Sequence, residues 1–334
     1  SIFNSSARGS NYGVGTYIKL LINILDRTKY NITIDKIIYK DIEFYISKKG
    51  SIRYISLPAP VINKNDLSYE AFEKSISFIL YPYIDKNEKN IFHLNYMCSK
   101  YLAEYLRFFT GGTIVLTVHY TDWSFSLLGN RNKLRRILKK EEKELDMQSR
   151  IILKNLTQEK DMLNICDKIV SISRHSYHDL IKIHEVDKNK ILLINNALID
   201  SYNKNEEKKA AIRKKLQINQ DDMILVFAGR LDPVKGVDIL ISAFKYIIKK
   251  HPNTHLFIAG EGDFNKWLFK SSPIWTRISF TGFLSKKNLR ELYKIADIGI
   301  VPSLHEEFGY VAIEMRSYEI PIVVNNKTGL AEII

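Results

Sequence analysis

Apolar positions along the chain alternate between two spacings. Short runs dominated by apolar residues, at residues 113–118, 223–228 and 298–301, are typical of buried strands. Other segments, such as residues 237–250, carry apolar residues every three or four positions, which is the spacing of one helix face. Strand and helix patterns alternate in both halves of the chain. This order predicts an α/β protein with two doubly wound parallel sheets.

The chain is expected to begin with a strand, a glycine-containing loop and a helix, at residues 1–4, 5–15 and 16–25. Gly13 and Gly15 start a dinucleotide-binding fingerprint, but Ile18 stands where its third glycine belongs, so that motif is absent. The loop is therefore either a flexible turn or a place where bare backbone approaches a ligand.

The other elements follow from the same spacings. In the first half we expect a hairpin of residues 43–46 and 53–57, strands at residues 32–39, 91–95, 113–118, 167–173 and 190–195, and helices at residues 69–83, 101–109, 131–166 (one or two helices) and 175–184. In the second half we expect strands at residues 223–228, 255–259, 278–281, 298–301 and 321–324, and helices at residues 237–250, after residue 263, at residues 287–295 and after residue 309.

Core spacing lapses near residue 200, where the chain becomes polar and rich in charge. We therefore predict two domains, residues 1–200 and residues 201–334.

The strand at residues 113–118 ends at His119, with Asp122 close behind. A lone histidine is commonly a structural residue. However, parallel strands carry functional side chains at their carboxyl ends, and histidine titrates near neutral pH. Both interpretations of His119 stay open on this evidence.

Residues 229–236 form a loop with two glycines and two cations, Arg230 and Lys235, between a predicted strand and a predicted helix. Glycine lets backbone N–H groups approach a phosphate, and arginine offers a fork of donors, so this loop suits a diphosphate. No Gly-Lys-Ser/Thr sequence occurs, so it is not a Walker loop. A charged, solvent-exposed loop is the alternative.

A second candidate site follows the strand at residues 298–301. Glu306 falls in the loop beyond the strand, and Glu314 falls in the first turns of a helix that begins after Phe308 and Gly309. Open α/β sheets hold ligands at this end of their strands, and a helix start attracts phosphate. The alternative is a capped surface helix with solvated glutamates.

Composition narrows the class of protein. The chain has 334 residues, 45% hydrophobic and 26% charged, which is typical of a globular protein. It contains two cysteines, Cys98 and Cys166, in unrelated contexts, so neither a disulfide framework nor a thiolate metal site is expected. No apolar run is long enough to span a membrane, and residues 1–15 do not resemble a secretory signal, so a cytoplasmic location is expected.

The formal net charge of +13 suggests an anionic partner. Cations gather at the start of the long helical segment: Arg131, Lys133, Arg135, Arg136, Lys139 and Lys140. A solvated helix surface explains them, and the alternative is a surface for acidic lipid or a polyanionic acceptor, which would make the protein a peripheral membrane protein. Nucleic acid is not expected as a partner, because these cations do not interleave with aromatic residues and no binding motif occurs.

Four ordered motifs in the second half resemble a known family. FAGRLDPVKGVDILISAF, LFIAGEGD, ISFTGFLS and ADIGIVPSLHEEFGYVAIE look like the carboxyl half of retaining glycosyltransferases of the GT-B fold, family four. In the first half the glycine loop, TVHYTDW, VSISRHS and LLINNALID resemble the amino half more loosely. The resemblance implies two Rossmann-like domains that face a cleft, with the donor mostly on the second domain and the acceptor on the first.

The resemblance also implies roles for particular residues. Arg230 and Lys235 would hold the diphosphate of a nucleotide sugar, Glu306 would contact the donor sugar, and His119 would reach toward the transferring sugar. Further donor-binding residues would be Gly13, Gly15, Gly282, Phe283, Phe308, Gly309, Tyr310 and Glu314. The family works without a bound metal, so no metal or other cofactor is expected.

The chain departs from the family at two points. Glu319 replaces a small turn residue after the second glutamate, and the chain ends at Ile334, where the family continues through further helices. A truncated carboxyl end without the closing helices is therefore expected.

The expected function is transfer of a sugar, with retention, from a nucleotide diphosphate to an acceptor hydroxyl in bacterial surface-glycan or glycoconjugate synthesis. The acceptor is a glycan, a lipid-linked glycan, a protein or a small molecule. The alternatives are a phosphorylase or disaccharide synthase on the same fold and, less favoured, a basic nucleic-acid-binding protein.

Overall fold

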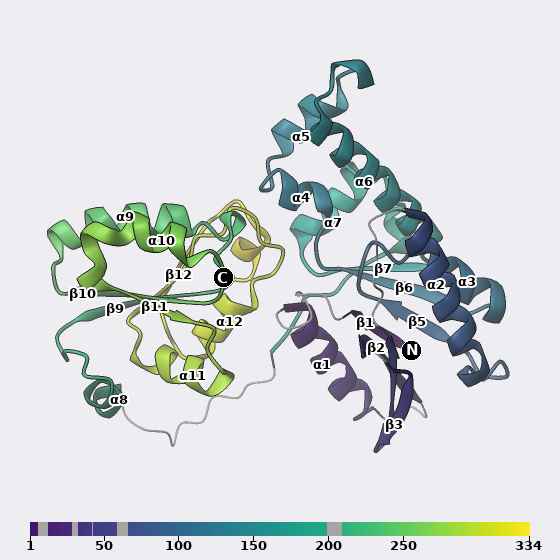
Figure 1. Cartoon of the computed structure of the whole chain (residues 1–334), viewed down its shortest axis with the longest axis horizontal. Helices are drawn as coiled ribbons and strands as arrows, with labels where there is room; N and C mark the ends of the chain where they lie inside the picture. Colours follow the sequence, from purple (N-terminus) through teal and green to yellow (C-terminus); the bar gives the residue numbers. More distant parts are fainter. Residues whose placement is uncertain (6–12, 29–32, 42, 59–65, 199–208) are drawn as a thin grey trace. The chain divides into compact units, whose positions relative to one another are not determined.

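A computed structural model describes the chain apart from residues 6–12, 29–32, 42, 59–65 and 199–208 (Figure 1). The chain divides into two compact units, Ser1–Asn196 and Ala197–Ile334. The boundary predicted near residue 200 falls outside the described residues.

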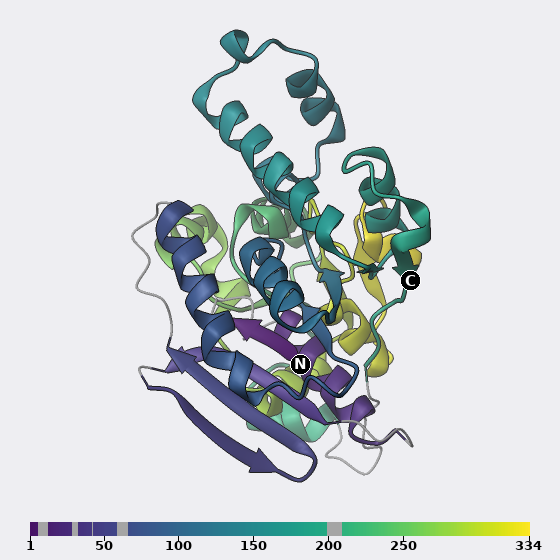
Figure 2. The same cartoon turned by 90° about the vertical axis from the view of Figure 1, so that its right-hand side faces the viewer.

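The first unit is built on an eight-stranded sheet within the described residues, in the order β3-β4-β2-β1-β5-β6-β7-β8. Its strands are β1 (Ile2–Ser5), β2 (Ile34–Asp41), β3 (Tyr45–Lys49), β4 (Ile52–Pro58), β5 (Ile91–Leu94), β6 (Thr113–Val118), β7 (Lys168–Ser171) and β8 (Ile191–Leu193). Neighbouring strands pair in parallel except for β3 and β4, which form the expected hairpin at one edge (Figure 2). The remaining strands confirm the predicted parallel sheet.

The helices of this unit pack on the sheet or, at residues 122–156, on one another, because each turns an apolar stripe toward its neighbours. They are α1 (Gly13–Leu25), α2 (Asp66–Leu80), α3 (Lys100–Thr110), α4 (Asp122–Ser126), α5 (Arg131–Leu138), α6 (Met147–Ile165) and α7 (Arg174–Lys182), with 3₁₀ turns η2 (Tyr81–Tyr83), η3 (Glu142–Glu144) and η4 (Lys188–Lys190). The core beneath them includes Phe3, Leu94, Leu116 and Ile169.

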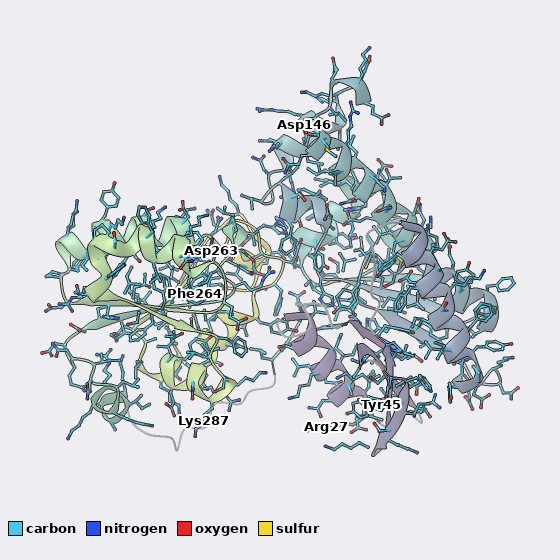
Figure 3. The ribbon with its side chains drawn as sticks, in the orientation of Figure 1. Arg27, Tyr45, Asp146, Asp263, Phe264 and Lys287 are labelled. Carbon is cyan, nitrogen blue, oxygen red and sulfur yellow. The ribbon has the colours of Figure 1, made fainter. Side chains whose placement is uncertain are left out.

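The segment predicted as one or two helices at residues 131–166 contains two α-helices. The second, α6, follows the N-cap residue Asp146 (labelled in Figure 3), whose carboxylate accepts a hydrogen bond from the Ser149 N–H at 2.7 Å. This N-cap ends the connection from α5 and starts α6. The α5–α6 pair projects away from the sheet of its own unit in both views (Figures 1 and 2).

One prediction for the first unit is wrong. Gly13 and Gly15 do not lie in a loop, because α1 begins at Gly13. The first four N–H groups of a helix lack partners within the helix in any case, so glycines in the first turn cost less than in a helix interior. Residues 6–12, the remainder of the expected loop, lie outside the described part of the chain.

The second unit has a five-stranded, fully parallel sheet in its described residues, in the order β11-β10-β9-β12-β13. Its strands are β9 (Met223–Ala228), β10 (Thr254–Ala259), β11 (Ile278–Gly282), β12 (Ile298–Val301) and β13 (Ile322–Val324). Its helices are α8 (Lys209–Lys215), α9 (Val237–Lys250), α10 (Phe264–Ser271), α11 (Lys286–Ile295) and α12 (Tyr310–Ser317), with 3₁₀ turns η5 (Pro233–Lys235), η6 (Ser272–Arg277) and η7 (Gly329–Glu332).

Two apolar clusters lie on the two faces of this sheet. One contains Leu240, Ile241 and Phe244 of α9 with Leu225, and the other contains Met315 of α12 with its own set of buried neighbours. Helices on both faces of a parallel sheet make the unit doubly wound, as predicted.

Candidate functional site

The strand order of the second unit reverses between β9 and β12. In open α/β sheets, ligands bind at the carboxyl ends of the strands on either side of such a reversal. The loops at that edge are residues 229–236 after β9 and residues 302–309 after β12. These are the two loops that the sequence singled out.

Lys235 and Glu306 join the two loops directly. Lys235 Nζ lies 2.5 Å from Glu306 Oε2, and the side chains are only 21% and 17% exposed. Ser303 Oγ lies 3.5 Å from the same carboxylate oxygen. A charge-assisted contact with little access to water is stronger than a surface ion pair, so each residue fixes the orientation of the other.

The backbones of the two loops also touch. The Leu304 N–H donates to the Val234 carbonyl at 2.8 Å. Gly236 has a φ of 71°, and a Cβ at this position would lie 2.2 Å from the Pro302 carbonyl oxygen. Glycine is therefore required here both for its conformation and for the close approach.

Arg230 starts the first loop and lies 3.1 Å from Asp232 Oδ2. The other Asp232 oxygen, Oδ1, is buried and accepts no hydrogen bond within the described chain. The loop follows a tight contact between strand ends, because a Cβ on Gly260 would lie 1.8 Å from the Gly229 carbonyl oxygen. Gly229 and Gly260 thus let the ends of β9 and β10 pass close together just before Arg230.

Glu314 lies in the second turn of α12, where the hydroxyl of the buried Tyr293 of α11 donates to Glu314 Oε2 at 3.4 Å. Burial raises the pKa of the Glu314 carboxyl, and the nearby cations Lys286 and Arg290 partly offset this effect. Burial also raises the pKa of Tyr293 well above its ordinary value. The tyrosine therefore remains a donor toward this carboxylate.

Gly309 marks the start of α12. Its φ is 80°, and a Cβ there would lie 1.9 Å from Leu330 Cδ1. Phe308 is buried, and its ring packs edge-on against Tyr310, with 5.1 Å between centroids. The loop and the first turn of α12 are therefore held as one piece, with helix N–H groups at their junction.

The segment after β13 supports this loop, a role that no local pattern in the sequence indicates. Asn325 Nδ2 donates to the Ser303 carbonyl at 3.1 Å, and the Gly329 N–H donates to the Glu306 carbonyl at 2.8 Å. A Cβ on Gly329 would lie 2.2 Å from the Glu307 carbonyl oxygen. Residues 325–330 thus fix the backbone that carries Glu306.

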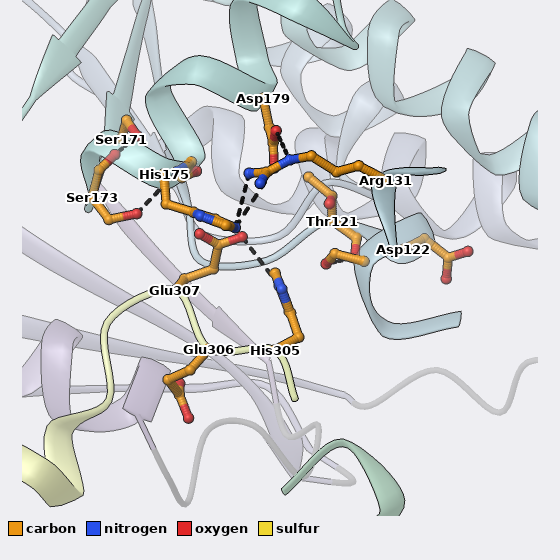
Figure 4. A network of polar contacts seen from close by, with 12 residues as sticks. Thr121, Asp122, Arg131, Ser171, Ser173, His175, Asp179, His305, Glu306 and Glu307 are labelled. Atoms are coloured by element: carbon orange, nitrogen blue, oxygen red, sulfur yellow. Dashed lines mark hydrogen bonds and ion pairs between the residues drawn. The ribbon is translucent and has the colours of Figure 1, made fainter. Parts of the chain in front are cut away.

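His305 and Glu307 flank Glu306 and are both buried. His305 Nε2 lies 3.2 Å from Glu307 Oε1 (Figure 4). Glu306, which stands between them, turns to Lys235 instead. Sequence reasoning missed this pair because alternate residues of a loop do not reveal which one points inward.

Gly282 and Phe283 follow β11 at the same edge of the sheet. The Gly282 carbonyl accepts a hydrogen bond from the Gly260 N–H at 2.8 Å, so this strand end is tied to that of β10. Phe283 is 57% exposed, which leaves ring surface available to a flat apolar ligand group.

In the first unit, His119 follows β6 and is half-buried. Asn95 Nδ2 donates to the Phe3 carbonyl, so Asn95 Oδ1 faces His119 Nε2 at 3.1 Å and accepts a hydrogen bond from its N–H. The ring therefore carries its hydrogen on Nε2 and leaves Nδ1 as an acceptor. Burial, with a smaller effect of His93, lowers the pKa of His119 to about 3, so the ring is neutral at physiological pH.

Two neighbours of His119 differ from expectation. Asp122 does not contact it; its carboxylate accepts a hydrogen bond from Asn155 Nδ2 at 2.8 Å. Tyr17 of α1 packs edge-on against the His119 ring at 4.8 Å between centroids, which places α1, the helix that starts with Gly13 and Gly15, beside this histidine.

Arg131 is one of the cations that the sequence assigned to a solvated or lipid-binding helix surface, but it contacts two residues of α7 instead. It forms a fork with Asp179, at 2.7 and 2.9 Å, and its NH2 group lies 2.9 Å from His175 Nε2 (Figure 4). This ion pair ties α5 to α7 within the first unit, so Arg131 is structural rather than a solvated cation.

Among the described residues, no group of three or more His, Cys, Asp or Glu side chains is arranged to hold a metal ion. Likewise, no helix in the described ranges is long and apolar enough to cross a bilayer.

Comparison with known proteins fits this geometry. Residues 208–334 match the family model of glycosyl transferases group 1. The second unit belongs to the group 1 glycosyl transferases. An uncharacterized glycosyltransferase of Methanocaldococcus jannaschii is 31% identical to this chain over 173 residues, which are 50% of this chain and 44% of that protein. The chain thus covers less than half the length of this curated relative.

Solved structures show the fold of both units. Sucrose-phosphate synthase from Thermosynechococcus elongatus superposes with a TM-score of 0.74 over 98% of this chain and 82% of its own, at 20% identity. Anabaena HepE, solved in complex with UDP and glucose, has a TM-score of 0.71 at 16% identity, over 100% of this chain and 82% of its own. The expected GT-B fold is confirmed, and the group 1 domain is its second Rossmann-like unit.

Proposed function

We propose that this protein transfers a sugar from a nucleoside diphosphate sugar to an acceptor hydroxyl, with the donor held by the group 1 domain. The observation that carries this proposal is the junction of the 229–236 and 302–309 loops, where Lys235 and Glu306 meet. A cation and a carboxylate held together at the reversal of a parallel sheet suit a ligand that carries both a diphosphate and sugar hydroxyls.

The donor contacts follow from the chemistry of each group. Arg230 and Lys235 bind the diphosphate, and backbone N–H groups at the start of α12, near Gly309 and Tyr310, add donors. Glu306 accepts hydrogen bonds from sugar hydroxyls, and Glu314 accepts them from the ribose. Gly282 and Phe283 border the base. The HepE structure, which contains UDP and glucose, supports a nucleotide donor for this fold.

His119 accepts a hydrogen bond from a hydroxyl of the transferring sugar. Its neutral ring and free Nδ1 acceptor suit that role better than proton transfer, because a group with a pKa of about 3 is a weak base. Gly13 and Gly15, in the first turn of α1, offer backbone N–H groups to the phosphates.

Retention of the anomeric configuration and independence of metal are also part of the proposal. Positive charge from Lys235, Arg230 and the start of α12 stabilises the departing diphosphate. A bound metal ion has the same role in other transferases. The leaving phosphate then helps to take the acceptor's proton. The acceptor is a glycan, a lipid-linked glycan or a protein, and we place the reaction in bacterial glycoconjugate synthesis.

A donor screen tests the proposal. The full chain is heated with UDP, GDP, ADP and their glucose or mannose derivatives, and the melting temperature is recorded. At least one nucleotide should raise it, because a ligand that binds only the folded state stabilises it. The chain is then incubated with that sugar donor with and without inorganic phosphate. A sugar 1-phosphate product would identify a phosphorylase, and no stabilisation by any nucleotide would contradict the proposal.

A further inference from the structure

The second unit has an open hollow away from the predicted donor loops. Its volume is about 530 Å³, and its lining consists of Lys245, Lys266, Phe269, Lys270, Ser272 and Pro273. These residues come from α9, α10 and η6, on the helical surface of the unit (Figure 1). The lining contains three cations and no carboxylate.

Large apolar side chains are exposed around this hollow. Phe269 is 84% exposed, Trp275 is 58% exposed and Leu268 is 38% exposed. Isolated exposed apolar residues are ordinary, but a group of them on neighbouring elements marks an interaction surface. We call Lys245, Lys266, Leu268, Phe269, Lys270 and Trp275 the basic–aromatic face.

The fold holds these side chains outward. Trp267 is buried in the core and donates from Nε1 to the Leu231 carbonyl at 3.3 Å, so it fixes the inner face of α10. Phe269 stands two residues further along the helix and therefore points to the opposite side. Asp263 caps the start of α10 (Figure 3), and Trp275 Nε1 donates to the Leu268 carbonyl at 2.9 Å. These contacts fix the position of the segment that carries the exposed rings of Phe269 and Trp275.

The three lysines of this face differ in their partners. Lys266 Nζ lies 4.5 Å from the centroid of the Trp267 ring. Lys270 contacts Asp238 of α9, and Lys245 forms no ion pair within the described part of the chain. Protein surfaces that bind in the headgroup layer of a bilayer combine lysines on flexible side chains with exposed aromatic and aliphatic side chains. The basic–aromatic face has this composition.

We propose that the basic–aromatic face docks the protein onto a bilayer that contains anionic lipid. The lysines meet the negative headgroups, and Phe269, Trp275 and Leu268 enter the boundary with the acyl chains. A lipid surface explains the exposed Leu268 better than a nucleic acid does. An aliphatic side chain cannot stack on a base, but its transfer from water into an apolar layer is favourable in free energy. The proposal is independent of the donor site and of the basic start of α5.

Vesicle co-sedimentation of the full chain tests this assignment. Vesicles of phosphatidylcholine with phosphatidylglycerol should bind the protein at low salt, and vesicles of phosphatidylcholine alone should bind it much less. The double variant Lys245→Glu, Lys266→Glu should weaken binding by about tenfold or more, since each cation near an anionic surface contributes about fivefold. Phe269→Ser should weaken it by about tenfold, because the ring no longer enters the boundary.

Matched controls separate this face from the rest of the surface. Lys182→Glu with Lys188→Glu changes the charge equally on exposed positions of the first unit, and Phe108→Ser removes a ring that is 82% exposed there. Both should bind vesicles as the unchanged chain does. A third comparison, Arg135→Glu with Arg136→Glu, tests the α5 surface that the sequence suggested.

The proposal is overturned by any of three results: no difference between the two vesicle types, unchanged binding of both basic–aromatic variants, or loss of binding in the control variants alone. Binding of a single-stranded oligonucleotide that competes with the vesicles and depends on Phe269 would also overturn it. Nucleotide-induced stabilisation is measured on every variant, so a failure of vesicle binding is distinguished from a failure of the proposed donor site.

Discussion

Lys235 and Glu306 stand 71 positions apart in the chain, yet the lysine Nζ lies 2.5 Å from a carboxylate oxygen of the glutamate. The contact spans the two loops on either side of the strand reversal. In the proposed complex, the diphosphate takes the lysine as its partner, and the carboxylate is left to accept sugar hydroxyls. The ion pair thus preorganises both groups before the donor arrives.

Lys235→Ala and Glu306→Ala should each lower the rate of sugar transfer by about two to three orders of magnitude, because each removes charge that stabilises the departing diphosphate or orients the sugar. The rate of release of the nucleoside diphosphate measures this effect. Lys287→Ala changes an exposed lysine on α11 (Figure 3) and should leave the rate unchanged. Near-normal rates for both site variants would remove the assigned roles.

Gly236→Ala should separate the two loops. The new Cβ would collide with the Pro302 carbonyl oxygen in a backbone conformation that already disfavours a side chain. We expect a loss of about 2 kcal/mol or more in the free energy of unfolding and loss of nucleotide binding. Gly50→Ala is the control: its φ is 62° and its Cβ would meet nothing within 4 Å. It should cost about 1 kcal/mol at most, and equal losses in urea unfolding would refute the steric explanation.

Glu319 is expected to be a strained residue. It follows α12 with a φ of 60°, and the hydrogen bonds Glu319 N–H to Arg316 and Ile320 N–H to Met315 form a motif that favours glycine at this position. Glu319→Gly should raise the free energy of unfolding by about 1 kcal/mol. Ala243→Gly, at an exposed position inside α9, should lower it by about 1 kcal/mol. Destabilisation by both changes in chemical denaturation would contradict this explanation.

His119 gives the stability a predictable dependence on pH. Its folded-state pKa of about 3 lies below the ordinary value of 6.5, so the unfolded chain binds the proton first as the pH falls. The His119 contribution therefore decreases stability as the pH falls from about 6.5 toward 3, and it is absent at higher pH. His119→Gln should lose less stability than the unchanged chain between about pH 7 and pH 5. Parallel pH curves for the two proteins would show that the histidine is not held neutral.

The elements of the second unit were largely predictable because their patterns are local. The helix expected at residues 237–250 has those bounds, and the strand at residues 223–228 is also as predicted. The placement of the loops that carry Lys235 and Glu306 at one edge of the sheet follows from a single rule, that parallel strands carry their functional loops at their carboxyl ends.

The supports of the site were not predictable, because they depend on contacts between distant residues that leave no periodic signal. Tyr293 beside Glu314, Asn325 behind Ser303 and Asn95 beside His119 belong to this class. The start of α1 was misjudged for a different reason: glycine is typical of loops, although the first turn of a helix tolerates it.

The central claim is that the loops joined by Lys235 and Glu306 form a nucleoside diphosphate site. Isothermal titration with the nucleotide that stabilises the chain most, applied to the unchanged chain, Lys235→Ala and Lys287→Ala, tests it most directly. We predict saturable binding by the unchanged chain and Lys287→Ala, and binding at least about tenfold weaker by Lys235→Ala, since a charged phosphate contact is lost. Equal affinity in all three proteins would contradict the claim.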